Sequence, residues 1–135
     1  MADITKAAGI LIRNKKLLVE RSKGKDFFIA PGGKVKEGET FKRALIRELR
    51  EEFKIRVSET DLEYFGTFTA KAAEDERKII SMTVFIVHSW QGEPTPDNEV
   101  EDIQWITSDI SKGLRVGSIF EHEVIPRLKE ANLIN

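Results

Sequence analysis

Short apolar runs separated by polar turns predict several strands along the chain. Residues 7–12 and 17–19 flank a charged turn at 13–16, which is typical of a β-hairpin. The apolar run at 27–30 ends at Pro31-Gly32-Gly33, where Pro cannot continue a strand ladder and a turn is expected. Further strands are predicted over 62–69, 78–90 and 103–106, with a turn-rich loop at 91–98.

The strand expected at 62–69 has an irregular apolar face. Alternation places Leu62, Tyr64 and Phe68 on one side, and we expect this strand to be largely buried. Gly66 interrupts that side and predicts a bulge or a close approach of another backbone. The pattern therefore predicts one core-facing side with a break in its middle.

Two segments have the spacing of helices. Thr40 is a suitable N-cap for residues 41–53, which are rich in helix formers and contain neither Gly nor Pro. The segment 120–131 has apolar residues at helical spacing, but Pro126 lies inside it, so this helix either begins near Ile125 or is kinked. Because no repeat or linker divides the chain, we expect one α/β domain over residues 1–135.

Composition narrows the function classes. The chain has 135 residues, 40% of them hydrophobic and 33% charged, which is typical of one globular domain. Its 22 basic and 23 acidic residues leave a net charge of -1, so no broad basic surface for nucleic acid or a membrane is expected. Without Cys, disulfides and thiolate metal sites are excluded, and we expect a cytoplasmic protein whose metal ligands are oxygen or imidazole.

The helix expected at 41–53 places charges against its own apolar pattern. On a helical wheel Glu48 and Glu52 fall inside the apolar sector and Glu51 beside it. The opposite, solvent-facing sector contains the basic residues Arg43, Arg47, Arg50 and Lys54. The three glutamates repel one another and lie near the helix C-terminus, where the dipole favours cations. A hard divalent cation such as Mg²⁺ or Mn²⁺ would remove that repulsion; alternatively, the glutamates pair with nearby Arg and Lys on a surface helix.

The residues around this helix resemble a family signature. The segment 33–55 is similar to the box GX5EX7REUXEEXGU of the Nudix hydrolases, where U is aliphatic. Gly33 is followed after five residues by Glu39, and after seven more residues by RELREEFKI at 47–55. The segments 8–10, 28–33, 92–94 and 103–106 look like the MutT branch. Lys54 replaces the last Gly of the box, which normally ends the helix in a left-handed conformation. The geometry of the helix end is therefore the point where the resemblance departs.

The resemblance implies an α/β/α sandwich with a mixed sheet, and cleavage of a pyrophosphate linkage in a nucleoside diphosphate joined to another group. Glu48, Glu51 and Glu52 match the family's Mg²⁺ ligands, and the backbone carbonyl of Gly32 matches a further one. Glu39 and Arg47 match a structural pair, through which Arg47 would orient the glutamates. Glu48, Glu51 and Arg47 are accordingly expected to take part in catalysis.

Other site residues follow less directly from the resemblance. An acid before the late strand often supplies a base or another ligand in this family; we take Glu101, with the alternatives Glu99, Asp102 and Gln104 left open. Arg21 and Phe28 are positioned to contact phosphate and base, or else to form a surface ion pair and part of the core. His88 and His122 are expected to be structural or exposed.

The expected function is that of a Mg²⁺-dependent Nudix pyrophosphohydrolase. Its substrate would be a nucleoside triphosphate, including damaged or non-standard ones, cleaved to the monophosphate and pyrophosphate. Alternatives are hydrolysis of another nucleotide conjugate, such as ADP-ribose or a dinucleoside polyphosphate, and a module that senses a nucleotide without cleaving it. We expect a monomer or homodimer with a small-molecule substrate, and neither nucleic acid nor membrane as partner.

Overall fold

Two sheets form the centre of the molecule. The computed structural model describes residues 2–72 and 75–135. The first sheet has the order β4-β1-β6-β5, with bounds Gly32–Lys34, Ile4–Ile10, Ile79–Val87 and Leu62–Lys71. It is mixed, because β1 and β6 are parallel and the other pairs antiparallel. The second sheet, in the order β2-β3-β7, is antiparallel and contains Ile12–Arg13, Lys16–Ser22 and Val100–Ile106.

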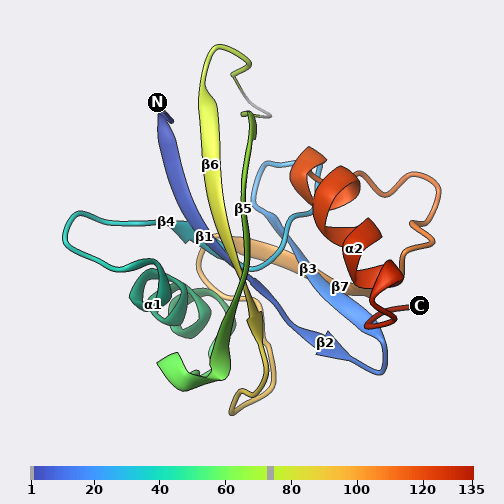
Figure 1. Ribbon diagram of the computed structural model, residues 1–135, viewed down its shortest axis with the longest axis horizontal. Coiled ribbons are helices and arrows are strands. Elements are labelled where there is room, and N and C mark those ends of the chain that lie inside the picture. Colours follow the sequence, from blue (N-terminus) through green and yellow to red (C-terminus); the bar gives the residue numbers. More distant parts are fainter. Residues whose placement is uncertain (1, 73–74) are drawn as a thin grey trace.

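Helices cover the strands on both sides. Figure 1 shows α1 (Phe41–Phe53) on one side of the crossing strands and α2 (Ile125–Glu130) on the other. Two groups of buried apolar side chains correspond to these sides, one that includes Leu45 and Leu49 of α1 and one that includes Val124 and Leu128. The expected α/β/α sandwich with a mixed sheet is confirmed, and the second sheet is an addition to it.

The helix α1 begins and ends as its sequence requires. The Thr40 hydroxyl accepts a hydrogen bond from the backbone N–H of Arg43 at 3.1 Å, which confirms the predicted N-cap. At the other end Lys54 has φ 59° and ψ 31°, the left-handed conformation that Gly takes in the family box. Its N–H donates to the carbonyl of Arg50 at 3.2 Å. The helix thus ends in the usual way although a lysine replaces the glycine.

The strand β5 differs from its prediction. The register of β5 against β6 shifts between Tyr64 and Gly66, which confirms the bulge. The extra residue turns the following side chains over, so Leu62 packs on the α1 side and Phe68 on the α2 side. Tyr64 is 60% exposed. The predictions of one shared face and of a largely buried strand were therefore wrong.

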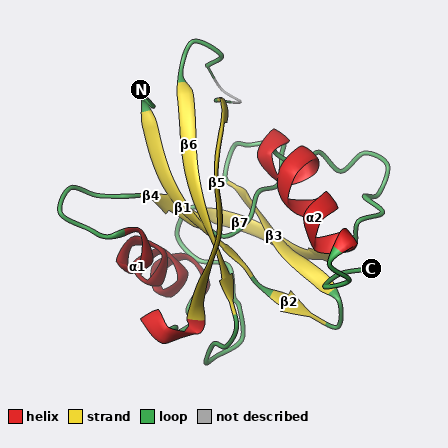
Figure 2. Ribbon diagram, viewed as in Figure 1, coloured by secondary structure: helices red, strands yellow, loops and turns green. Residues whose placement is uncertain are grey.

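The remaining elements follow the predicted pattern with altered bounds. β2 and β3 form the predicted hairpin, whereas residues 28 and 29 make only isolated bridges. β7 begins at Val100, so Glu101 and Asp102 lie in a strand and not in the preceding loop. Figure 2 shows long loops between β6 and β7 and after β7.

The C-terminal helix starts earlier than Pro126 alone would suggest. Residues 118–130 are helical, and the turn Phe120–Val124 is a π-helix directly before α2. The N–H of Ile125 donates to the carbonyl of Phe120, five residues back. A wide turn before a proline is expected, since proline has no N–H to continue the regular ladder. The helix is irregular just before Pro126, but it begins earlier, at residue 118.

Candidate active site

Arg47 is the centre of a carboxylate cluster. Its Nε and Nη2 atoms donate to the two carboxylate oxygens of Glu39 at 2.7 and 3.0 Å. Its Nη1 atom donates to Glu48 at 3.0 Å and to Glu51 at 2.9 Å, and Nη2 also reaches the carbonyl of Lys34 at 3.1 Å. One guanidinium therefore joins the loop before α1 to two of its glutamates, because its planar fork has five donors.

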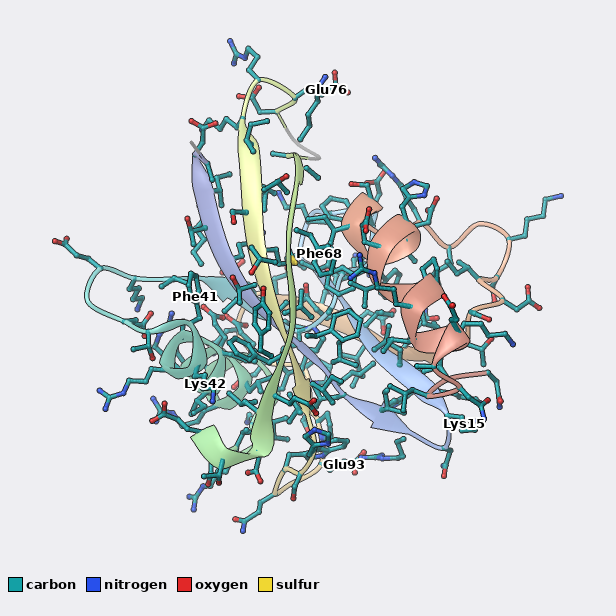
Figure 3. All side chains as sticks on the ribbon, in the orientation of Figure 1. Lys15, Phe41, Lys42, Phe68, Glu76 and Glu93 are labelled. Atoms are coloured by element: carbon teal, nitrogen blue, oxygen red, sulfur yellow. The ribbon has the colours of Figure 1, made fainter. Side chains whose placement is uncertain are left out.

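The helical wheel placed Arg47 on the solvent face, and this was wrong. Its side chain is only 16% exposed, whereas Arg43, Arg50 and Lys54 are exposed as predicted. Phe41, the apolar residue at the start of the same helix, is itself 41% exposed and is labelled in Figure 3 beside α1. The wheel assumes solvent opposite the core, but the loop carrying Glu39 covers this side of the helix.

The charge state of Glu39 is set by this contact. The hydrogen bond from Arg47, helped by the backbone N–H of Lys36 at 2.8 Å, lowers the pKa of Glu39 to about 2. Arg47 stays protonated because the same carboxylates raise its pKa further. The Glu39–Arg47 pair implied by the family resemblance is present, and both groups are ionised at neutral pH.

Two adjacent glycines bring β4 against the cluster. A Cβ on Gly33 would lie 2.5 Å from the Cδ atom of Glu48, so only glycine allows this carboxylate to approach the strand so closely. Gly32 has φ +152°, and a Cβ there would lie 2.1 Å from the carbonyl oxygen of Ala7. The pairing of Ala8 with Gly32 fixes β4 beside β1. The turn residues thus position the strand edge next to Glu48.

Glu52 contacts a different part of the chain. Its Oε2 atom accepts a hydrogen bond from the backbone N–H of Glu99 at 3.1 Å, and its carbonyl accepts from Asp97 at 2.9 Å. The Asn98 side chain donates to the carbonyl of Glu51 at 2.6 Å. The loop before β7 is therefore fastened to the end of α1, which brings Glu99 next to Glu52.

Burial raises the pKa of two of the glutamates. For Glu48 and Glu52 burial is the main cause that raises the pKa, and repulsion from neighbouring carboxylates adds to it. Arg47 opposes the rise at Glu48, and the Glu99 N–H opposes it at Glu52. An added cation would relieve both carboxylates.

The donor chemistry of the cluster fits a hard divalent ion. Glu48, Glu51 and Glu52 supply carboxylate oxygens, which Mg²⁺ and Mn²⁺ prefer. Within residues 2–72 and 75–135, no three acidic or histidine side chains converge closely enough to enclose an ion in this conformation. Arg47 binds Glu48 and Glu51, whereas Glu52 accepts from the Glu99 N–H.

Arg21 and Glu101, which the sequence placed in separate roles, are partners. Arg21 Nη2 donates to Glu101 Oε1 at 2.8 Å, and Nη1 reaches the carbonyl of Lys25 at 3.3 Å. The structure therefore shows the surface ion pair that was the alternative for Arg21. Among the acids near β7, Glu99 contacts the cluster through its backbone, whereas Glu101 contacts Arg21.

A cavity of about 380 Å³ is lined in part by Lys34, whose carbonyl accepts a hydrogen bond from Arg47 of the cluster. Its apolar lining includes Phe27, Ile29, Ile119 and Phe120, and lysines from several strands line it as well: Lys6, Lys25, Lys34, Lys71 and Lys78. The lining residues come from β1, β3, β5, β6 and the C-terminal helix, so only the fold brings them together. Apolar walls with a few polar groups are typical of small-molecule sites.

Of the two adjacent phenylalanines, Phe27 and not Phe28 lines this cavity. Phe28 is 6% exposed and belongs to the core on the α2 side. Its backbone N–H donates to the carbonyl of Arg115 at 2.7 Å, which fixes the segment in place. Phe27 lines the cavity instead. The expected contact of Phe28 with a base is replaced by its alternative, a role in the core.

Sequence reasoning missed Glu20. This residue lies in β3 and is 4% exposed, and it lines the cavity. It directly follows the apolar residues 17–19, so a charged side chain there suggested the end of a strand and nothing more. His88 and His122 are exposed, as expected; His88 lies 2.6 Å from Glu63.

The fold and the site together define an α/β protein with an arginine-anchored carboxylate cluster beside a cavity. A family model described as NUDIX domain matches residues 3–127. The chain therefore belongs to the Nudix family, within its MutT-like branch. In the part that the structure describes, no helix is long and apolar enough to span a membrane.

Two curated relatives match part of the chain. An 8-oxo-dGTP diphosphatase of Haemophilus influenzae is 43% identical over 94 residues, which cover 65% of this chain and 65% of the relative. An uncharacterized Nudix hydrolase of Bacillus subtilis, YvcI, is 29% identical over 96 residues, or 71% and 61% of the two chains. The chain thus spans about three fifths to two thirds of the length of these relatives.

Solved structures agree in fold. The solution structure of the Escherichia coli ORF135 protein is 25% identical, has a TM-score of 0.75, and aligns over 97% of this chain and 94% of that one. A structure from work on MutT of Aliivibrio salmonicida and Vibrio cholerae has a TM-score of 0.71 at 24% identity, with coverages of 94% and 98%. The likeness extends over nearly the whole chain.

Proposed function

We propose that the protein is a Mg²⁺-dependent hydrolase that cleaves a nucleoside triphosphate, including damaged or non-standard ones, to the monophosphate and pyrophosphate. The observation that carries this proposal is the Arg47-centred cluster beside the cavity, because it combines oxygen ligands with space for a nucleoside. The similarity to an 8-oxo-dGTP diphosphatase supports the same reaction class.

Each part of the cluster has a distinct role in this proposal. Glu48, Glu51, Glu52 and the carbonyl of Gly32 would hold Mg²⁺ or Mn²⁺. When bound, the ion neutralises phosphate charge and lowers the pKa of a bound water. Arg47 is a positioning residue, since its guanidinium holds Glu48 and Glu51 in place.

The base that receives the proton from water is assigned to an acid near β7. The sequence favours Glu101 as this base, but its carboxylate is paired with Arg21 at 2.8 Å. The backbone of Glu99 contacts Glu52 directly. We therefore propose Glu99 ahead of Glu101. Comparison of Glu99→Gln with Glu101→Gln tests this choice, and the larger loss of turnover identifies the base.

The cavity is the proposed nucleoside site. Phe27 and Phe120 supply apolar surface for a base, and the lysines that line the cavity offset the negative charge of a nucleotide. Arg21 lies at the end of β3, but its ion pair with Glu101 has to open before it can contact a phosphate. Lysines are thus the first candidates for phosphate contacts.

Glu52→Gln tests the proposed function. The variant removes one charge from the cluster but keeps the side-chain volume, so Mg²⁺-dependent pyrophosphate release should fall at least about 100-fold. The matched control is Glu63→Gln, which removes an exposed carboxylate from β5 and should leave turnover unchanged. Retained turnover in Glu52→Gln, with Mg²⁺ still required, would contradict the assignment.

The remaining alternatives are separated by a substrate screen. Cleavage of ADP-ribose to AMP and ribose 5-phosphate, or of a dinucleoside polyphosphate to two nucleotides, with poor cleavage of triphosphates, would change the substrate class. Tight nucleotide binding without Mg²⁺-dependent turnover would show a sensing module. The cytoplasmic location, the extent of the domain over 1–135 and the oligomeric state stay predictions.

A further inference from the structure

Glu20 is a buried carboxyl group that faces the cavity. Among the described residues, Glu20 is the one charged residue that is buried, with 4% of its surface exposed. Its backbone is satisfied by Ile29, through N–H···O contacts of 2.7 and 2.8 Å in the two directions. The backbone pairing fixes β3 at this point, and the Glu20 side chain lines the cavity.

The carboxyl group of Glu20 has acceptor capacity to spare. The Ser22 hydroxyl hydrogen-bonds to it. A carboxylate has about four acceptor positions, so the Ser22 hydroxyl does not fill all of them. Burial and the charges of Glu52 and Glu48 raise the pKa of Glu20 to about 7, while Lys6 opposes the rise. Glu20 is buried and lines the cavity, so a ligand that enters the cavity and supplies N–H donors meets an acceptor there.

The chemistry of a nucleotide limits what that ligand group can be. Phosphate oxygens are acceptors and are negative, so they cannot satisfy a carboxylate. A sugar hydroxyl can donate, but a 2′-deoxyribose has one free hydroxyl, and one donor does not satisfy both carboxylate oxygens. The N–H groups of the base are the strong donors. Phe27 and Phe120 line the same cavity and suit a flat base, which would present its edge to the wall.

We propose that Glu20 selects the base of the substrate by accepting hydrogen bonds from two adjacent N–H groups, as guanine presents them. Guanine has an imino N1–H next to its 2-amino group, which matches the two oxygens of one carboxylate. Hypoxanthine lacks the amino group, and adenine and cytosine place a ring acceptor beside their single amino group. Oxidation of guanine at C8 leaves this edge unchanged. The inference rests on the proposed function, because it assumes a nucleotide in the cavity.

A binding experiment without metal isolates the role of Glu20. Titration calorimetry of the full chain with dGMP and dIMP, in the presence of EDTA, compares ligands that differ by the 2-amino group. The unaltered protein should bind dGMP about 10- to 100-fold more tightly, since the amino group hydrogen-bonds to a charged acceptor. In Glu20→Gln the preference should fall below about threefold, because an amide NH₂ then faces the base N–H. Glu63→Gln, the matched control, should keep the full preference.

Two further measurements keep the test decisive. With Mg²⁺, the ratio of kcat/KM for dGTP over dITP should fall in Glu20→Gln by the same factor as the binding ratio. If Glu20→Gln does not fold, Ser22→Ala removes the hydroxyl that orients the carboxyl group, and the preference for dGMP should be reduced at least about threefold.

The outcomes separate this inference from the proposed function. No binding of dGMP, or equal binding of dGMP and dIMP by the unaltered protein, would overturn the assignment of Glu20. An equal loss for both nucleotides in Glu20→Gln would overturn it as well and indicate a role at the cluster. Absence of Mg²⁺-dependent hydrolysis with an intact dGMP preference would refute the proposed reaction and leave the assignment of Glu20 standing.

Discussion

The Arg47 cluster and the cavity wall at Glu20 both contain carboxyl groups shielded from solvent, yet the pKa values of these groups are shifted in opposite directions. The guanidinium of Arg47 lowers the pKa of Glu39 to about 2. At Glu20, burial and neighbouring glutamates raise the pKa to about 7. Burial alone does not decide whether a carboxyl group is ionised; the distance to a cation does. In the cluster a guanidinium hydrogen-bonds the carboxylate directly, whereas at Glu20 the charge of Lys6 only partly offsets burial and the neighbouring glutamates.

The two regions also differ in how the chain builds them. Arg47, Glu48 and Glu51 lie within one turn of a helix, so local spacing alone brings them together. Glu20 contacts the cavity with residues from other strands and from the C-terminal helix. A change near the cluster should therefore affect activity first, and a change at the cavity wall should affect ligand choice.

Alanine at the two adjacent glycines should separate folding from activity in the cluster. Gly32→Ala places a Cβ 2.1 Å from the backbone oxygen of Ala7, which cannot move without breaking β1, so we expect a loss of at least about 4 kcal/mol in unfolding free energy. Gly33→Ala meets only the end of the Glu48 side chain. Its stability should fall by about 1 kcal/mol or less, and turnover about tenfold.

Chemical denaturation and pyrophosphate release measure the two effects. If Gly33→Ala were the more destabilising of the pair, β4 would not be held against β1 and Glu48 as the structure shows.

Replacement of the central cation should disrupt the cluster. Arg47→Lys keeps one charge but cannot reach Glu39, Glu48 and Glu51 together, because an ammonium lacks the planar fork. We expect a 10- to 100-fold loss of kcat and a loss of about 2–3 kcal/mol in stability. Arg50→Lys, on the exposed side of the same helix, is the control and should change neither. Full activity in Arg47→Lys would show that charge alone suffices.

The raised pKa of Glu20 predicts a pH effect of definite sign. A carboxyl group whose folded pKa is about 7 instead of 4.5 binds its proton more tightly in the folded state, so stability is highest below pH 4.5 and is lost as pH rises through 7. Glu20→Gln should therefore be more stable than the unaltered protein at pH 8, by on the order of 2–3 kcal/mol, and equal to it near pH 4.5.

Thermal unfolding without metal at these two pH values measures the difference. A Glu20→Gln variant that is less stable at pH 8 would contradict the raised pKa, because it would mean that the folded protein stabilises the ionised form of Glu20.

The smallest expected effect is at the end of α1. Lys54 adopts a left-handed conformation with φ 59°, which glycine adopts without steric cost. Its ion pair with Asp97, at 3.7 Å between exposed groups, adds little. Lys54→Gly should stabilise the protein by about 0.5–1 kcal/mol and leave turnover unchanged, as measured by urea denaturation. A destabilised variant would show that the side chain of Lys54 contributes more than its backbone strain costs.

Much of the cluster could be predicted from sequence. The helix 41–53, its Thr40 cap and the inward glutamates follow from local spacing, and the structure confirms the helix and the cap. Arg47 could not be placed by the wheel, because a distant loop covers the face that the wheel assigns to solvent. Likewise, one extra residue at the β5 bulge reversed the faces of the strand, which alternation cannot anticipate.

The sequence by itself determined the helix, its ends and the spacing of its charged residues, because these depend on hydrogen bonds and contacts within a few residues. Only the tertiary structure decided which carboxyl groups are buried, which acid lies beside Glu52, and that Glu20 faces a cavity. Those properties depend on the distances between segments far apart in the chain, and electrostatic and solvation energies change steeply with such distances.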